Sequence, residues 1–208
     1  MKILIADDHA IVRKGLIQIL KEEFPFAEIT EISNSNEILK EVRKDNWDII
    51  LLDISMPGQN GIEILKQIRF EEIKTPILML SMHPEEQYAV RVLKAGASGF
   101  LNKQSATDEL LNAVHKVLSG RKYITTSVAE QLAESLNEKN PTHIYELLSD
   151  REMQVLVLIA SGKTVSEIAT QIALSVNTIS TYRVRILEKL NIKNNAELTR
   201  FAIDNNLV

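Results

Sequence analysis

The feature that most constrains the fold is an alternation of short apolar segments with helix-length amphipathic segments, which continues through residue 119. Ile49–Leu52 is continuously apolar and not alternating, as in a strand that is buried on both faces of a sheet. The segments between the short apolar ones carry apolar residues at helical spacing. Five such units predict an α/β domain with a five-stranded, doubly wound parallel sheet and helices on both faces. The expected strands are Lys2–Ala6, Glu28–Ile32, Trp47–Leu52, Ile77–Leu80 and Gly99–Leu101.

A second domain is predicted from residue 147 onward, where the pattern changes to helices joined by short turns. The polar stretch 137–143 contains a proline and is the best candidate for the centre of a linker. We therefore expect a first domain over 1–120, a linker with a helical segment over 121–146, and an all-α domain over 147–208.

Composition excludes several classes of protein. With 45% hydrophobic and 25% charged residues, the chain is typical of a soluble protein with a core. No apolar run approaches the roughly 18 residues of a membrane span, so no membrane partner is expected. The N-terminal segment is too short and too acidic for a signal peptide. The absence of cysteine excludes disulfides and thiolate metal sites and fits a cytoplasmic protein. The four scattered histidines lack zinc-ligand spacing and are expected to be surface or packing residues.

Net charge does not identify a partner. Residues 1–120 hold 14 basic and 18 acidic residues, and residues 144–208 hold seven of each. Binding to nucleic acid therefore has to be argued from local patterns.

Polar residues follow the predicted strands at their carboxyl ends, where open α/β sheets bind ligands. These residues are Asp7, Asp8, Asp53, Ser81 and Lys103. Alone, each has a plain explanation as a cap or a solvated surface residue, but five of them at corresponding positions predict one pocket. Two carboxylates about 4 Å apart repel by about 4 kcal/mol at an effective dielectric near 20, and a hard cation would offset this. Oxygen ligands suit Mg²⁺, and the lysine and the serine hydroxyl could support a carboxylate nucleophile.

Residues 1–119 resemble the receiver domain of bacterial response regulators, which has a flavodoxin-like fold. The resemblance rests on Asp7-Asp8, on LLDISMPGQNG around Asp53, on Ser81, and on AGASGFLNK, which ends at Lys103. It implies that a sensor histidine kinase phosphorylates Asp53 with Mg²⁺ as cofactor.

The same resemblance assigns roles to further residues. Asp8, Asp53 and the backbone carbonyl of Ser55 would bind Mg²⁺, which Asp7 would reach through water. Ser81 and Phe100 match a switch pair whose rearrangement reports phosphorylation, beside Lys103. Gln104 stands where receivers often carry proline.

The second domain carries clear helix boundaries. Ser149 with Glu152, and Thr164 with Glu167, form the pattern of a capping box. Ser175 is a plausible N-cap for a helix that runs to about residue 190. The three residues 173–175 separate this helix from the previous one, which predicts a helix-turn-helix.

One face of the second of these helices is expected to be free. Ile179, Ile186 and Leu190 should pack inward, which leaves a polar and basic face outward. From residue 177 to 193 there are four basic residues and one acidic residue. Phosphate contacts need such cations, and short side chains can read base edges in the major groove. The candidate DNA-binding residues are Asn177, Thr178, Ser180, Thr181, Arg183, Val184 and Arg185, with Lys163, Lys189, Lys193 and Asn194 as further phosphate contacts.

Residues 147–208 resemble the LuxR-type DNA-binding domain, and the two domains together resemble a NarL/FixJ-type response regulator. The resemblance rests on LSDRE, LIASGKTVSEIA and LSVNTIS…ILEKL. Ser180, Tyr182 and Arg185 replace the residues that are frequent in the family, so no relative's target sequence is transferred. The resemblance assigns dimerisation to Leu198, Phe201 and Ala202, in an expected helix over 196–204. These residues could equally close the domain core.

The favoured hypothesis is a two-component transcription factor that phosphorylation switches. Its expected partners are a sensor histidine kinase, double-stranded promoter DNA and a second copy in an active homodimer, with RNA polymerase as a further candidate. The alternatives are a DNA-binding regulator that works without phosphorylation and a Mg²⁺-dependent phosphohydrolase. The latter lacks an acid two residues after Asp53, where Ser55 stands. Apart from self-catalysed phosphoryl transfer and dephosphorylation, no enzymatic activity is expected.

Overall fold

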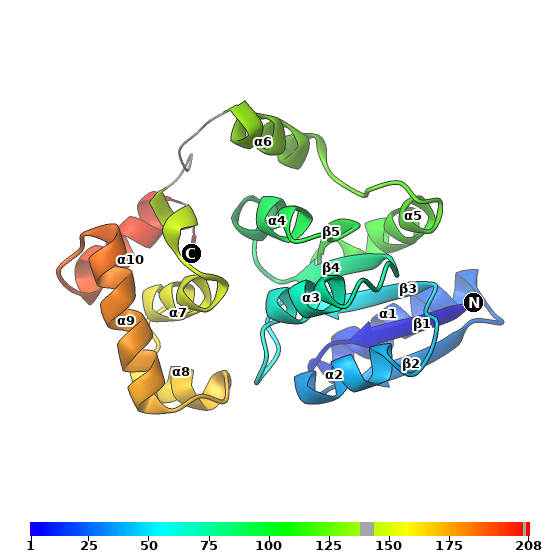
Figure 1. Cartoon of the computed structure of the whole chain (residues 1–208), viewed down its shortest axis with the longest axis horizontal. Helices are drawn as coiled ribbons and strands as arrows, with labels where there is room; N and C mark the ends of the chain where they lie inside the picture. The colour runs from blue at the N-terminus through cyan, green and yellow to red at the C-terminus, as the bar shows by residue number, and fades with distance from the viewer. Residues whose placement is uncertain (138–143, 206) are drawn as a thin grey trace. The chain divides into compact units, whose positions relative to one another are not determined.

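The computed structural model of the chain describes residues 1–137, 144–205 and 207–208. Most of the predicted linker centre, from residue 138 to 143, lies outside the described residues. The chain divides into two units, Met1–Gln131 and Leu132–Val208, whose elements are labelled in Figure 1. In the described part we find no helix with the length and apolar character that a membrane crossing requires.

The first unit is built on a five-stranded parallel sheet with the order β2-β1-β3-β4-β5. The predicted doubly wound fold is therefore confirmed. The strands are β1 (Lys2–Ala6), β2 (Glu28–Ile32), β3 (Ile49–Asp53), β4 (Ile77–Ser81) and β5 (Gly99–Asn102).

The bounds of three strands differ from the prediction. The predicted start of β3 at Trp47 was wrong, because the indole of Trp47 turns toward α2 (Ser35–Val42) and donates to the carbonyl oxygen of Glu41 at 3.3 Å. The ladder between β1 and β3 begins only at Ile49. At their other ends β3, β4 and β5 each continue one residue beyond the predicted end, because the ladder pairs the polar residues too.

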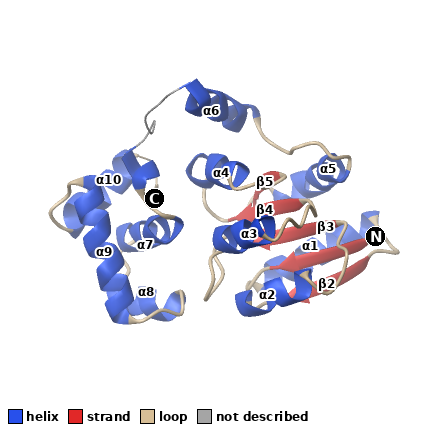
Figure 2. Ribbon diagram, viewed as in Figure 1, coloured by secondary structure: helices blue, strands red, loops and turns tan. Residues whose placement is uncertain are grey.

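Helices cover both faces of the sheet (Figure 2). α1 and α5 pack together on one face, where Ile3, Ile5 and Leu51 join their apolar side chains in the core. On the other face α2 packs against β1, β2 and α3, and α4 packs against β5. β3 and β4, which lie inside the sheet, are accordingly buried along their whole length. The helices of this unit are α1 (Ala10–Glu23), α2, α3 (Gly61–Phe70), α4 (Glu85–Lys94) and α5 (Ala106–Leu118), after which α6 (Thr126–Asn137) follows.

After α5 the chain returns to the edge strand β5. The amide of Tyr123 donates to the carbonyl oxygen of Ser98 at 2.9 Å, and the ammonium of Lys122 donates to that of Ala97 at 2.7 Å. A Cβ atom on Gly99 would lie 2.8 Å from the carbonyl oxygen of Tyr123, so only glycine allows this approach. The returning segment thus covers part of an edge that would otherwise expose unpaired backbone groups.

The second unit is helical, as predicted. A short 3₁₀ helix (Ile144–Leu147) is followed by α7 (Asp150–Ala160), α8 (Val165–Gln171), α9 (Val176–Leu190) and α10 (Asn195–Asp204). Both predicted capping boxes and the N-cap at Ser175 are confirmed. The turn between α8 and α9 has four residues (172–175) instead of three, because α8 already ends at Gln171. α7 packs against both α9 and α10.

Candidate functional site

The polar residues at the carboxyl ends of the strands lie together in one buried pocket. Asp53 ends β3, Ser81 ends β4, and Asp7 and Lys103 directly follow β1 and β5. All four are buried. The Nζ atom of Lys103 lies 2.8 Å from Oδ2 of Asp7 and 2.9 Å from Oδ2 of Asp53. One lysine thus lies between two carboxylates that are 46 positions apart in the sequence.

The pocket holds more negative charge than its lysine neutralises. Burial raises the pKa of Asp53, although the charge of Lys103 acts in the opposite direction. Three buried carboxylate oxygens accept no hydrogen bond from the described residues, namely Oδ2 of Asp7, Oδ1 of Asp8 and Oδ2 of Asp53. The nitrogen atoms nearest to them, Nζ of Lys103 and Nδ1 of His9, are close but lack the geometry of a hydrogen bond. Buried oxygens in this state favour an additional cation.

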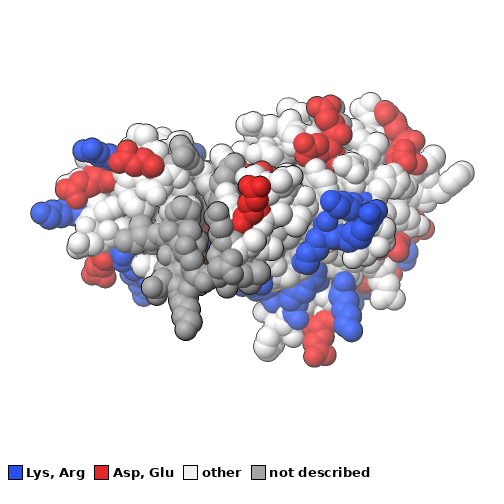
Figure 3. Space-filling view, turned by 90° about the horizontal axis from the view of Figure 1, so that it is seen from above, with Lys and Arg blue, Asp and Glu red and all other residues white. Residues whose placement is uncertain are grey.

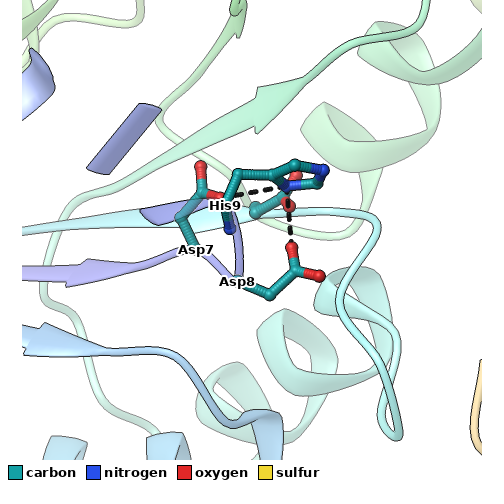
Figure 4. Close-up of side chains that lie close together, drawn as sticks. Asp7, Asp8 and His9 are labelled. Carbon is teal, nitrogen blue, oxygen red and sulfur yellow. Dashed lines mark hydrogen bonds and ion pairs between the residues drawn. The ribbon is translucent and has the colours of Figure 1, made fainter. Parts of the chain in front are cut away.

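His9 joins this cluster, which the sequence did not predict. Its Nδ1 atom lies 2.8 Å from Oδ1 of Asp8 and 3.3 Å from Oδ1 of Asp7, and Figure 4 shows the imidazole beside both carboxylates. One ligand atom from each of Asp7, Asp8, His9 and Asp53 lies within 4.8 Å of the others. The signal in the sequence is its position directly after Asp7-Asp8, which is independent of zinc-ligand spacing.

The cluster could hold a divalent cation. The oxygens that accept no hydrogen bond belong to carboxylates, and carboxylate oxygens are suitable ligands for a hard ion such as Mg²⁺. Ser55 lies next to this group, since its amide donates to Oδ1 of Asp53 at 3.3 Å. The chemistry of these residues therefore fits the predicted metal.

The two residues of the expected switch pair are both buried inside the first unit. Ser81 is fully buried, and its hydroxyl oxygen accepts the amide of His83 at 3.0 Å. Phe100 is 4% exposed. The ring of His83 packs on Tyr88 with a centroid distance of 5.5 Å, and burial, together with the charge of Lys103, lowers the pKa of His83. The hydroxyl of Ser81 is thus hydrogen-bonded to the backbone of His83, whose ring packs on Tyr88 of α4.

In the second unit, α9 presents the face that its sequence predicted. Ile179, Ile186 and Leu190 are buried. Arg183 is half-buried, and its Nε donates to Oδ1 of Asn195 at 2.6 Å. The exposed candidates are Asn177, Ser180, Thr181, Val184 and Arg185. The half-buried Thr178 instead shares a 2.7 Å hydrogen bond with the N-cap hydroxyl of Ser175.

The candidate phosphate contacts differ in their surroundings. The ammonium of Lys189 lies 2.6 Å from Oε2 of the buried Glu152. Lys163 donates to the side chain of Gln171, whereas Lys193 is exposed. Asn194 serves as the N-cap of α10. The ion pair of Lys189 indicates a structural role that competes with a contact to DNA.

The three candidate dimerisation residues are not on the surface together. Leu198 and Ala202 are fully buried within a single copy, and Phe201 is half-buried. The structure therefore supports the alternative that Leu198 and Ala202 close the domain core. The large apolar side chain that α10 does expose is Ile203.

Figure 3 shows both basic and acidic side chains on the face that it presents. Because residues 144–208 carry seven basic and seven acidic residues, the candidate DNA-binding surface is defined by the local exposed face of α9 and not by net charge.

Comparison with known families agrees with both units. Residues 3–115 match the model of the response regulator receiver domain, and residues 146–202 match that of the LuxR family of bacterial regulatory proteins. The chain is 36% identical to the response regulator UvrY of Escherichia coli (strain K12) over 208 residues, which cover 100% of this chain and 95% of that one. It is 34% identical to the oxygen regulatory protein NreC of Staphylococcus aureus (strain JH9), with coverage of 100% and 99%.

A solved structure supports the same assignment. RcsB of Salmonella enterica serovar Typhimurium, bound to the promoter rprA in the presence of the phosphomimetic BeF₃⁻, matches with a TM-score of 0.66 and 27% identity over 97% of each chain. The chain belongs to the two-component response regulators. Its pairing of a receiver with a LuxR-type DNA-binding domain is that of the NarL/FixJ type.

Proposed function

We propose that Asp53 is the phosphoacceptor of this response regulator and that its phosphorylation controls DNA binding by α9. The observation that carries the proposal is the position of Lys103 between Asp7 and Asp53, at 2.8 and 2.9 Å. An ammonium at this place can neutralise charge on a phosphoryl group as that group forms on Asp53.

The chemistry follows from the residues of the pocket. A carboxylate oxygen of Asp53 attacks the phosphorus of a phosphohistidine on the sensor kinase, the P–N bond breaks, and the imidazole leaves with the electron pair. Asp8, Asp53 and the carbonyl of Ser55 would hold Mg²⁺, with Asp7 beside them. When bound, this ion neutralises charge on the phosphoryl oxygens. Slow self-catalysed dephosphorylation would use water in place of the histidine.

The conformational change that follows phosphorylation would begin at the switch pair, Ser81 and Phe100. A phosphoryl group adds charge and acceptor oxygens at the end of β3. The hydroxyl of Ser81 would donate to one of these oxygens, and Phe100 would repack with it. We place the receiver at residues 1–120, the linker at 121–146 and the DNA-binding domain at 147–208.

A dimer on promoter DNA is the proposed active form. Solved structures of RcsB include one described as two dimers bound to two parallel DNAs. In this chain, Ser180, Thr181 and Arg185 on the exposed face of α9 would read base edges in the major groove. Two copies would bind paired half-sites.

Phosphorylation with a small acyl phosphate tests the first step. We expect the wild-type protein to incorporate one phosphoryl group in the presence of Mg²⁺, measured by intact-protein mass spectrometry. Asp53→Asn should incorporate none, while Asp108→Asn, which changes an exposed acid at the start of α5, should behave as wild type. Equal labelling of Asp53→Asn would overturn the assignment. Continuous release of phosphate from an added phosphoester would instead favour the phosphohydrolase.

DNA binding tests the second step. We expect BeF₃⁻ with Mg²⁺ to tighten binding to DNA selected from a random pool, and Asp53→Asn to lose this response. If both proteins bind equally tightly with and without BeF₃⁻, the protein regulates without phosphorylation.

A further inference from the structure

We infer that Ser35 is a positioning residue for the divalent cation of the receiver, because it holds the loop that carries Ser55. The inference rests on the proposed function, in which the backbone carbonyl of Ser55 binds the ion. Ser35 itself is the first residue of α2 and belongs to none of the strand ends that form the pocket.

The hydroxyl of Ser35 joins α2 to the tip of the loop between β3 and α3. Its Oγ donates to the carbonyl oxygen of Pro57 at 2.6 Å and accepts the amide of Gln59 at 2.9 Å. Ser35 is fully buried. One side chain thus fixes two peptide groups of the loop, which lie on either side of Gly58.

Gly58 makes this close approach possible. Its φ of +87° lies in the left-handed region, which favours glycine. A Cβ atom at this position would lie 2.7 Å from Oγ of Ser35, which is closer than such atoms can come. The turn at Gly58 and the hydroxyl of Ser35 therefore form one packed unit.

The base of the same loop is held independently. The amide of Gly61 donates to the carbonyl oxygen of Ile54 at 2.9 Å, and the amide of Ile54 donates to that of Leu80 at 2.9 Å. Ser55 lies between this closed base and the tip that Ser35 holds. Its carbonyl is therefore attached to fixed backbone on both sides.

Loss of the Ser35 hydroxyl should weaken Mg²⁺ binding more than it slows phosphorylation of Asp53. Residues that orient metal ligands typically contribute about 10- to 100-fold to metal affinity. Because Ser35 acts on one backbone ligand of several, we expect Ser35→Ala to weaken Mg²⁺ binding by about tenfold. At saturating Mg²⁺ the loop is held by the ion itself, so the rate of phosphorylation should stay within about twofold of wild type.

The test measures Mg²⁺ binding to the full chain by isothermal titration calorimetry, without any phosphoryl donor. Phosphorylation by an acyl phosphate is then followed as a function of Mg²⁺ concentration. Ser35→Thr retains a hydroxyl and should bind Mg²⁺ within about threefold of wild type. Ser33→Ala removes an exposed hydroxyl two residues away and is the matched control. Amide hydrogen exchange at Gln59 reports whether the tip of the loop is released.

The expected result is faster exchange at Gln59 and weaker Mg²⁺ binding in Ser35→Ala but not in Ser33→Ala. The saturated rate should be unchanged in both variants. Unchanged Mg²⁺ affinity with faster exchange would overturn the inference, because the tip would then be released without consequence for the ion. An equal loss of affinity in Ser33→Ala would also overturn it. If the wild-type protein itself binds no Mg²⁺, the proposed function fails, and this outcome is distinct from the others.

Discussion

The buried pocket around Asp53 and the exposed face of α9 are built in opposite ways. The pocket collects side chains from the ends of different strands, between Asp7 and Lys103, and buries them. The face of α9 comes from one helix of 15 residues, and its candidate contacts are largely exposed. In the pocket the stability of each charged side chain depends on its charged neighbours. Each exposed side chain on α9 would instead contribute to binding mainly through its own contacts. Substitutions should therefore be coupled in the first region and local in the second.

The largest effect is expected from Lys103→Met. It leaves the buried carboxylates of Asp7 and Asp53 without their cation, which should lower the free energy of unfolding of the metal-free receiver by about 3 kcal/mol. Urea unfolding followed by the fluorescence of Trp47, the single tryptophan of the chain, measures this. Lys14→Met on the exposed side of α1 is the control. A variant as stable as wild type would mean that the charges of the pocket are not coupled.

On α9, Arg185→Ala should weaken DNA binding by about tenfold or more, as expected for the loss of a contact to a base edge. Fluorescence anisotropy with DNA selected from a random pool measures the change. Arg200→Ala removes an exposed arginine of α10 and should change binding little. If the two variants lose affinity equally, α9 is not the reading element.

Asp53→Asn should stabilise the metal-free fold, whereas Lys103→Met should destabilise it. Because burial raises the pKa of Asp53, its ionised form destabilises the metal-free fold. The neutral amide should raise Tm by a few degrees at pH 7. The destabilisation vanishes as pH falls below the ordinary carboxyl value, so the difference in Tm should shrink toward pH 4. A difference that does not depend on pH would show that the amide acts through packing.

Glu152→Gln should lower the stability of the second unit by about 1 kcal/mol, because the neutral amide loses the ion pair with Lys189. Burial opposes ionisation of Glu152, but hydrogen bonds from Lys189 and Ser149 prevail and lower its pKa. The ionised carboxylate therefore stabilises the fold above the unfolded value of 4.5, and this contribution is lost as pH falls through the lower folded value. Thermal unfolding by circular dichroism should show the gap to wild type closing in acid. Glu188→Gln, at an exposed position of α9, should show no such dependence.

The smallest effect is expected on the salt dependence of DNA binding, in which Lys193 and Lys189 should differ. Lys193→Ala should reduce the dependence of DNA affinity on salt by about one unit of slope, because an exposed phosphate contact is lost. Lys189→Ala should leave that slope unchanged and lower stability instead, since its ammonium is paired with Glu152. The reverse pattern would mean that the ion pair opens when DNA binds.

The fold was predictable because its signals are local and agree with one another. Continuous apolar strands, capping boxes at Ser149 and Thr164, and carboxylates at strand ends each have a direct physical meaning. Strand bounds were less accurate, because ladder pairing extends to polar residues such as Asn102, which hydropathy does not mark.

Other parts of the site required coordinates. Ser35 is one serine among polar neighbours, and only the structure brings its hydroxyl to the loop between β3 and α3. The pairing of Lys189 with Glu152 joins residues 37 positions apart, so a basic helix pattern could not reveal it. The family resemblance could not decide between the core and a dimer for Leu198 and Ala202, whereas their burial supports the core.

A crystal structure of the receiver with Mg²⁺ and BeF₃⁻ tests the central claim most directly. We expect one ion at about 2.0–2.1 Å from oxygens of Asp8, Asp53 and the carbonyl of Ser55, with BeF₃⁻ on Asp53 and the ammonium of Lys103 beside it. An ion bound away from these oxygens, or BeF₃⁻ on another residue, would contradict the account.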